Sequence, residues 1–170
     1  GIKRAHPEKT LAAIWIDAHA DLHSPYSTPS GNVHGMPLAA ALGNDNMEFK
    51  RNKVEQQALD DWETLKNMGG ITPIIKPEHL TYFGLRDYEN EEAAIMEKLQ
   101  IRNYPVHELR QRSFKTCIAE TLERLAEVDL IYVTFDVDAL DCDLISRGTG
   151  TPVSKGFDPQ EVIQLIQGIQ

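Results

Sequence analysis

Short apolar runs that end in acidic residues mark the predicted strands of this chain. Residues 11–17 (LAAIWID) and 129–138 (DLIYVTFDVD) are apolar almost without interruption, which is typical of strands with both faces buried. We expect residues 129–138, the more apolar of the two, to form a strongly buried strand. Residues 79–87 (HLTYFGLRD) predict another strand, and residues 106–109 (VHEL) predict a weaker one.

Helical patterns alternate with these runs. Five segments place apolar residues at helical spacing or carry helix-end signals, over residues 36–43, 54–70, 90–100, 113–127 and 158–167. Ser113 is a plausible N-cap, and Pro159 stands at the first position of the last helix, where proline is favoured. Strands that alternate with helices predict an α/β fold with a mostly parallel sheet, in a single domain over residues 1–170.

The composition is that of an ordinary globular domain, with 41% apolar and 25% charged residues among 170. No apolar run is long enough to span a bilayer, and no signal-peptide pattern opens the chain. A net charge of −9 without a Lys/Arg block argues against nucleic acid and anionic membranes as partners. The only cysteines, Cys117 and Cys142, favour a reducing compartment. We expect a cytoplasmic protein, and a mitochondrial location stays open because the chain begins with Gly1 rather than Met.

Metal-ligand side chains follow the first predicted strand. Asp17, His19 and Asp21 stand at alternate positions, so an extended chain would point them the same way. Sites in parallel α/β sheets lie beyond the carboxyl ends of the strands, which is where these residues fall. Taken alone, the pattern fits a solvated polar strand end as well as it fits a metal site.

A second acidic group follows the most apolar strand and favours the metal site over the solvated strand end. Asp136 and Asp138 again share a face, and four aspartates gathered at one rim would raise one another's pKa. A divalent cation removes that cost, and carboxylate oxygens with an imidazole nitrogen favour Mn²⁺ over Mg²⁺ or Zn²⁺. Two cations about 3.5–4 Å apart would use all these carboxylates and activate a shared water for hydrolysis.

Five short motifs now resemble those of a known family. They are DAHAD at 17–21, SGNVHG at 30–35, GLRD at 84–87, FDVDALD at 135–141 and TGTP at 149–152. In this order they resemble the arginase branch of the ureohydrolase family. The resemblance implies a three-layer α/β/α fold and a site with two Mn²⁺ ions. It also implies hydrolysis of L-arginine to L-ornithine and urea, as in arginine metabolism and the urea cycle.

The same resemblance assigns the metal ligands. Asp17 and Asp136 correspond to carboxylates that bridge the two ions. His19 and Asp138 correspond to ligands of one ion. Asp21 corresponds to a ligand of the other ion that also contacts the bridging hydroxide.

The resemblance also assigns residues to the substrate. His34 corresponds to a proton-shuttling histidine, and Ser30 and Asn32 to groups that bind the α-carboxylate. Glu89 stands where the family usually has an aspartate for the α-ammonium, and Thr151 corresponds to a threonine that lines the site. As bare residues, each also fits an ordinary role in a turn, a helix end or an exposed loop.

Several features depart from the family. His23 stands where an asparagine usually contacts the α-carboxylate, and residues 142–148 differ from the usual loop. The family's first metal-ligating histidine and its guanidinium-binding acid have no counterpart here, so we expect the central part of a longer enzyme, weakly active or inactive by itself.

Two other functions stay open. One is an agmatinase-like or other amidino hydrolase, and the other is a truncated, inactive metal-binding domain. The family resemblance further implies a homo-oligomer, a trimer or a hexamer, in the parent enzyme.

Overall fold

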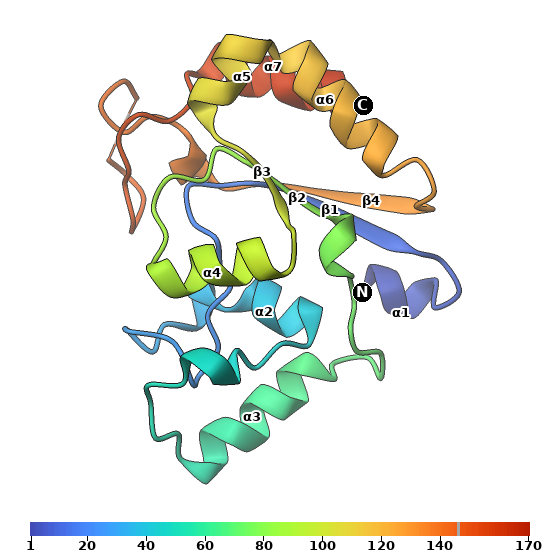
Figure 1. Cartoon of the computed structure of the whole chain (residues 1–170), viewed down its shortest axis with the longest axis vertical. Helices are drawn as coiled ribbons and strands as arrows, with labels where there is room; N and C mark the ends of the chain where they lie inside the picture. The colour runs from blue at the N-terminus through green and yellow to red at the C-terminus, as the bar shows by residue number, and fades with distance from the viewer. Residues whose placement is uncertain (146) are drawn as a thin grey trace.

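Four parallel strands form the centre of the computed structural model, which describes residues 1–145 and 147–170. The strands are β1 (Leu11–Ile16), β2 (Leu80–Phe83), β3 (Arg102–Tyr104) and β4 (Leu130–Phe135). Their order is β3-β2-β1-β4, and every neighbouring pair is parallel. The predicted α/β fold with a mostly parallel sheet is confirmed (Figure 1).

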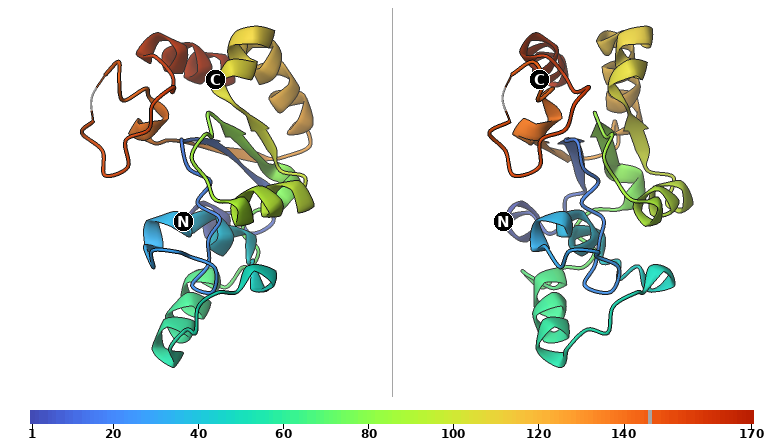
Figure 2. Two further views of the ribbon diagram at one scale, coloured as in Figure 1. Left: turned by 60° about the vertical axis from the view of Figure 1, so that its left-hand side comes forward. Right: turned by 90° about the vertical axis from the view of Figure 1, so that its left-hand side faces the viewer.

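Helices cover both faces of this sheet and make three layers. They are α1 (Ile2–Ala5), α2 (Pro37–Leu42), α3 (Gln56–Lys66), α4 (Asn90–Lys98), α5 (Val106–Arg112), α6 (Phe114–Arg124) and α7 (Pro159–Ile169). Single 3₁₀ turns are η1 (Val33–Gly35), η2 (Met47–Phe49), η3 (Pro77–His79) and η4 (Val137–Ala139). Helices α5, α6 and α7 lie on one side, while α2 and α4 lie on the other and α3 extends beyond α2 (Figures 1 and 2).

Alternation along β1 produces two hydrophobic cores. Ile14 and Ile16 face the α5–α7 layer, where they share a cluster with Leu109, Phe114 and Leu165. Ala13 faces the opposite layer, with its own cluster of Leu38, Tyr82, Leu85, Ile95 and Met96. Because β1 is buried on both faces, it is apolar throughout, as its sequence predicts.

Helix ends follow the expected capping chemistry. The Ser113 hydroxyl accepts a hydrogen bond from the Thr116 amide at 3.2 Å, so its predicted role as a cap is confirmed. Asp158 caps α7 in the same way, with Pro159 at the first helical position. None of the described helices has the length and apolarity that crossing a bilayer requires.

The predicted strand over residues 106–109 is wrong, because these residues begin helix α5. Pro105 precedes the helix, and its lack of an amide hydrogen costs nothing at this position. Val106 and Leu109, three positions apart, both face the core, which is helical spacing. The real strand, β3, lies just upstream of Pro105.

The predicted deep burial of β4 is also wrong. The exposed fractions of its side chains are 38% for Ile131, 44% for Tyr132, 37% for Val133 and 40% for Phe135. In the described part of the chain, β4 pairs only with β1 and lies at the edge of the sheet. The hydrophobic pattern of residues 129–138 correctly predicts a strand with apolar side chains on both faces. It does not identify the residues that would cover those faces.

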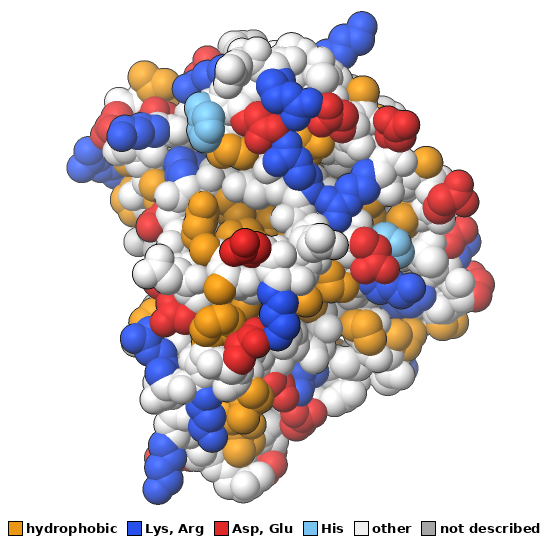
Figure 3. All heavy atoms as spheres, in the orientation of Figure 1, with side chains coloured by type: hydrophobic (Ala, Val, Ile, Leu, Met, Phe, Trp, Pro, Cys, Tyr) orange, Lys and Arg blue, Asp and Glu red, His pale blue; other side chains and the backbone are white. Residues whose placement is uncertain are grey.

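The surface carries charges of both signs. On the face shown in Figure 3, acidic and basic side chains are interspersed, and no large basic patch appears.

Candidate metal centre and substrate cavity

A cavity of about 500 Å³ opens at the carboxyl end of the sheet, where α/β proteins place their sites. All eleven residues predicted for the site line it: Asp17, His19, Asp21, His23, Ser30, Asn32, His34, Glu89, Asp136, Asp138 and Thr151. They come from segments spread over more than 130 positions of the chain, so the fold brings them together.

Strand pairing brings the acidic strand ends side by side. β1 and β4 are parallel neighbours with Ile16 opposite Phe135, and each strand is followed at once by an aspartate. The Asp136 amide continues the ladder by donating to the Ile16 carbonyl at 2.9 Å. The expected meeting of two acidic strand ends at one rim is therefore seen.

Asp17, His19 and Asp138 form a compact group, here named the rim cluster. His19 Nδ1 lies 3.1 Å from Asp138 Oδ2 and 3.6 Å from Asp17 Oδ1. One ligand atom from each of the three residues lies within 4.8 Å of the others. Both carboxylates are buried, with 4% of each aspartate exposed, while His19 is open toward the cavity.

Surrounding donors fix the orientation of the two carboxylates. Asp138 accepts hydrogen bonds from the Thr151 hydroxyl at 2.9 Å and from the Ala18 amide at 3.3 Å. Asp17 accepts from the His19 amide at 2.8 Å. Thr151, expected to line the site, therefore also orients a candidate metal ligand.

Asp21 and Asp136 line the cavity but stand outside this cluster. Asp136 is exposed and accepts a hydrogen bond from the Asp138 amide at 3.0 Å. Asp21 has a φ of +54°, a left-handed conformation in which the chain turns away from β1. The structure thus brings three of the five predicted metal ligands into one compact cluster, while the other two, Asp21 and Asp136, line the same cavity outside that cluster.

The electrostatics of the rim show a deficit of positive charge. Burial, aided by Asp17 and neighbouring acids, raises the pKa of Asp21 to about 8. Burial also raises the pKa of Asp17, although the contact with His19 opposes it. Hydrogen bonds to Asp138 and Asp17 raise the pKa of His19 to about 10. The raised pKa values mean that these groups keep protons that balance the negative charge of the carboxylates. A divalent cation bound to the same carboxylate oxygens would supply this positive charge instead, so the donor set fits such an ion.

A second group, here named the α4 cluster, consists of His23, Glu89 and Glu92. His23 Nε2 lies 2.9 Å from Glu89 Oε2 and 3.6 Å from Glu92 Oε2. Its other nitrogen, Nδ1, lies 3.2 Å from the Ser27 hydroxyl. The structure therefore joins His23 and Glu89, for which the sequence predicted separate substrate contacts.

Glu92 was not predicted as a site residue. It is buried, and it accepts hydrogen bonds from the Leu22 amide at 3.0 Å and the Glu89 amide at 3.1 Å. Burial, together with the nearby Glu89 carboxylate, raises the pKa of Glu92 to about 8. In the sequence it is an acid in the first turn of a helix, which has an ordinary explanation.

Asp87 also went without a predicted role. Its carboxylate lies 3.5 Å from His19 Nε2, on the side away from Asp138. Both Asp87 and Glu92 follow the carboxyl end of β2, so strand-end position was the signal that could have found them.

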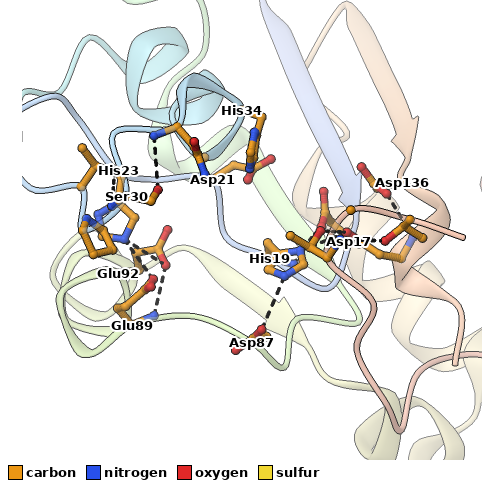
Figure 4. A pocket seen from close by; sticks show the side chains of 18 residues that line it. Asp17, His19, Asp21, His23, Ser30, His34, Asp87, Glu89, Glu92 and Asp136 are labelled. Atoms are coloured by element: carbon orange, nitrogen blue, oxygen red, sulfur yellow. Dashed lines mark hydrogen bonds and ion pairs between the residues drawn. The ribbon is translucent and has the colours of Figure 1, made fainter. Parts of the chain in front are cut away.

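The loop with Ser30, Asn32 and His34 forms another part of the cavity wall. All three side chains are exposed, and His34 belongs to the 3₁₀ turn η1. The Ser30 hydroxyl accepts from the Asn32 amide at 3.2 Å. In Figure 4, His34 and Asp21 appear between the α4 cluster and the side of the cavity that holds Asp17 and His19.

Fold and site together define an α/β protein with a candidate metal-binding group of two carboxylates and an imidazole at the carboxyl end of a parallel sheet. The sequence matches the family described as "Arginase family" over residues 1–170. The chain therefore belongs to the arginase family, as its motifs indicated.

Individual relatives give the extent of the match. The arginase of Bacillus subtilis (strain 168) is 34% identical over 89% of this chain and 45% of the relative. The crystal structure of Helicobacter pylori arginase superposes with a TM-score of 0.82 at 31% identity, over 99% of this chain and 54% of that one.

An arginase of Entamoeba histolytica, solved in complex with L-ornithine, gives a TM-score of 0.80 at 28% identity, over 99% of this chain and 51% of that one. The chain thus spans about half the length of the relatives it matches.

Proposed function

We propose that this chain forms the metal-binding part of a manganese-dependent hydrolase that converts L-arginine to L-ornithine and urea. The observation that carries the proposal is the rim cluster inside a cavity lined by all eleven residues predicted for the site. Membership of the arginase family supports the reaction class, and the relatives named as arginases support the substrate.

The residues around the rim divide between two cation positions in this proposal. His19 and Asp138 would hold one ion and Asp21 the other, and the carboxylates of Asp17 and Asp136 would contribute to the same site. Bound divalent cations supply Lewis-acid chemistry, since they lower the pKa of water and stabilise negative charge.

The rest of the cavity wall binds and orients the substrate. Ser30 and Asn32 are exposed on the loop and offer hydroxyl and amide donors to an α-carboxylate. The hydrogen bond from Glu92 and the contact with His23 lower the pKa of Glu89, so Glu89 stays ionised and attracts an α-ammonium group. His23 has both ring nitrogens engaged, by Glu89 and by Ser27, so it orients the Glu89 carboxylate instead of contacting the substrate carboxylate as predicted.

Proton transfer falls to His34. Its imidazole is exposed to the cavity in a short turn, so it can exchange protons with solvent and with a departing amine.

Comparison of L-arginine with agmatine tests the proposed substrate. Binding of each to the Mn²⁺-loaded protein is measured by calorimetry, and urea is assayed in the same samples. We expect L-arginine to bind at least about 10-fold more tightly, because agmatine leaves the carboxylate donors unpaired.

Glu89→Gln should remove most of the L-arginine affinity, while Glu91→Gln, on the same helix turn but outside the cavity, should not. A preference for agmatine would exclude L-arginine as the substrate, and failure of both ligands to bind would favour the alternative of an inactive metal-binding domain.

A further inference from the structure

Arg86 occupies an unusual position beside the rim cluster, because among the described residues its guanidinium binds main-chain oxygens alone. Within the described residues it makes five hydrogen bonds, all to carbonyl oxygens. Nε donates to Ser154 at 2.9 Å, Nη1 to Gly84 at 3.1 Å, and Nη2 to Asp138 at 2.7 Å, Val153 at 2.9 Å and Leu140 at 3.2 Å.

These carbonyl groups belong to three separate segments. Gly84 follows β2, Asp138 and Leu140 follow β4, and residues 153–154 follow Thr151. The Arg86 amide also donates to the Ala18 carbonyl at 3.0 Å, between Asp17 and His19 in the sequence. A single residue thus contacts the main chain at, or next to, every member of the rim cluster.

The space around the guanidinium is closely filled. A Cβ atom at Gly156 would lie 2.6 Å from Arg86 Nη2 and 2.5 Å from the Ala139 carbonyl oxygen. The segments on either side are paired, since the Phe157 amide donates to Ala139 at 3.0 Å and the Asp141 amide to Phe157 at 2.8 Å. A lysine ammonium cannot reach these five acceptors, because its three donors radiate from one atom.

The contact with Asp138 links this arrangement to the metal centre. Arg86 holds the Asp138 carbonyl, while the Asp138 carboxylate accepts from Thr151 and lies against His19. Thr151 in turn precedes the segment that Arg86 holds through Val153 and Ser154. Both partners of the Asp138–Thr151 hydrogen bond therefore depend on the same guanidinium.

We propose that Arg86 is a positioning residue that fixes Asp138 and Thr151 relative to each other and so sets the cation affinity of the rim cluster. The effect on affinity rests on the proposed function, whereas the positioning itself does not. Residues that orient metal ligands typically change affinity 10–100-fold when they are replaced.

The test compares Arg86→Lys with Arg124→Lys. Arg124 also donates to two carbonyl groups, of Glu78 at 3.1 Å and Gln100 at 3.4 Å, but lies outside the cavity. Amide hydrogen exchange is measured on the metal-free proteins, and Mn²⁺ affinity is measured by calorimetry. We expect Arg86→Lys alone to speed exchange at Asp138, Asp141 and Phe157, and to weaken Mn²⁺ binding about 10-fold.

The other possible results of the exchange and Mn²⁺-binding measurements distinguish a positioning role of Arg86 from general destabilisation and from failure of the proposed function. Exchange that speeds up equally in α6 would show general destabilisation and overturn the proposal, as would an unchanged Mn²⁺ affinity. If the unaltered protein binds no Mn²⁺, the proposed function fails, while local exchange still decides whether Arg86 positions Asp138. If Arg86→Lys does not fold, Thr151→Val decides, because unchanged Mn²⁺ affinity in that variant would overturn the proposal.

Discussion

The rim cluster and the α4 cluster hold the same kinds of residue and differ in how the chain builds them. Each combines one imidazole with two carboxylates in a single cavity. The acids of the α4 cluster are three residues apart and also form the capping box of α4. The acids of the rim cluster lie just beyond the ends of two different strands, β1 and β4, and both are buried.

This difference suits the two clusters to different cations. Glu92 has both oxygens occupied by backbone amides, and Glu89 is about half exposed, so this cluster offers a single open carboxylate to an organic ammonium. The rim cluster concentrates two buried carboxylates on one imidazole, which suits a small divalent ion. The two clusters contain the same residue types, so it is their position in the fold that determines which cation each one suits.

The largest expected effect is on metal binding. Asp17→Asn removes a carboxylate from the rim cluster, and we expect Mn²⁺ binding at least about 100-fold weaker, since the ion loses a charged ligand. Calorimetric titration with Mn²⁺ measures this. Glu92→Gln and the exposed Asp60→Asn serve as controls and should change the affinity less than about 3-fold. Equal losses in Asp17→Asn and Glu92→Gln would mean that the two clusters are not distinct.

The next effect is a pH dependence of stability. The pKa values of Asp21 and Glu92 are raised to about 8 from ordinary values of 3.8 and 4.5. The folded protein therefore binds more protons than the unfolded chain over this interval. The associated stability is complete below about pH 4, falls as the pH rises from there, and is lost once the pH passes about 8. Urea unfolding of the metal-free protein should show a loss on the order of 2 kcal/mol between pH 6 and pH 9.

Adding Mn²⁺ and substituting Glu92 distinguish the contributions of the two clusters to this pH dependence. Mn²⁺ should reverse the trend at the rim, because the ion binds the deprotonated carboxylates. Glu92→Gln should reduce the metal-free loss by about 1 kcal/mol, since an amide cannot ionise. Stability that rises with pH in the metal-free protein would contradict the raised pKa values.

The smallest effect concerns the support of the α4 cluster. The buried Ser27 hydroxyl accepts from the Ser24 amide at 3.0 Å and contacts His23 Nδ1. Ser27→Ala leaves these groups unpaired and should cost about 1–2 kcal/mol of unfolding free energy, with Mn²⁺ affinity unchanged. Thr64→Ala, at an exposed position of α3, should cost less than about 0.5 kcal/mol.

The sequence predicted the centre of the sheet and the content of the cavity well. The apolar runs ending in Asp17 and Asp136 predict adjacent strand ends, because parallel strands place their carboxyl termini at one rim. The motif at 30–35 supplied the loop residues, which carry no distinctive periodicity of their own. Here the motif, rather than the hydrophobic pattern, carried the information.

The misses have identifiable physical causes. Residues 106–109 are too few to separate a strand from a helix, and the proline before them was the better signal. Glu92 caps a helix as well as facing the cavity, so its local role concealed the second one. Burial of β4 depends on neighbours that its own side chains cannot specify, and Arg86 acts through carbonyl groups, which leave no trace in residue identity.

The open edge at β4 has a consequence for every measurement on this chain. Within the described residues no strand pairs with the outer side of β4, and its apolar side chains are partly exposed, so this edge is a template on which another polypeptide can build. Association would thus begin there as concentration rises. Because β4 runs straight into Asp136, whatever docks on that strand would also dehydrate this carboxylate, so cation titrations need dilute protein to report the monomer.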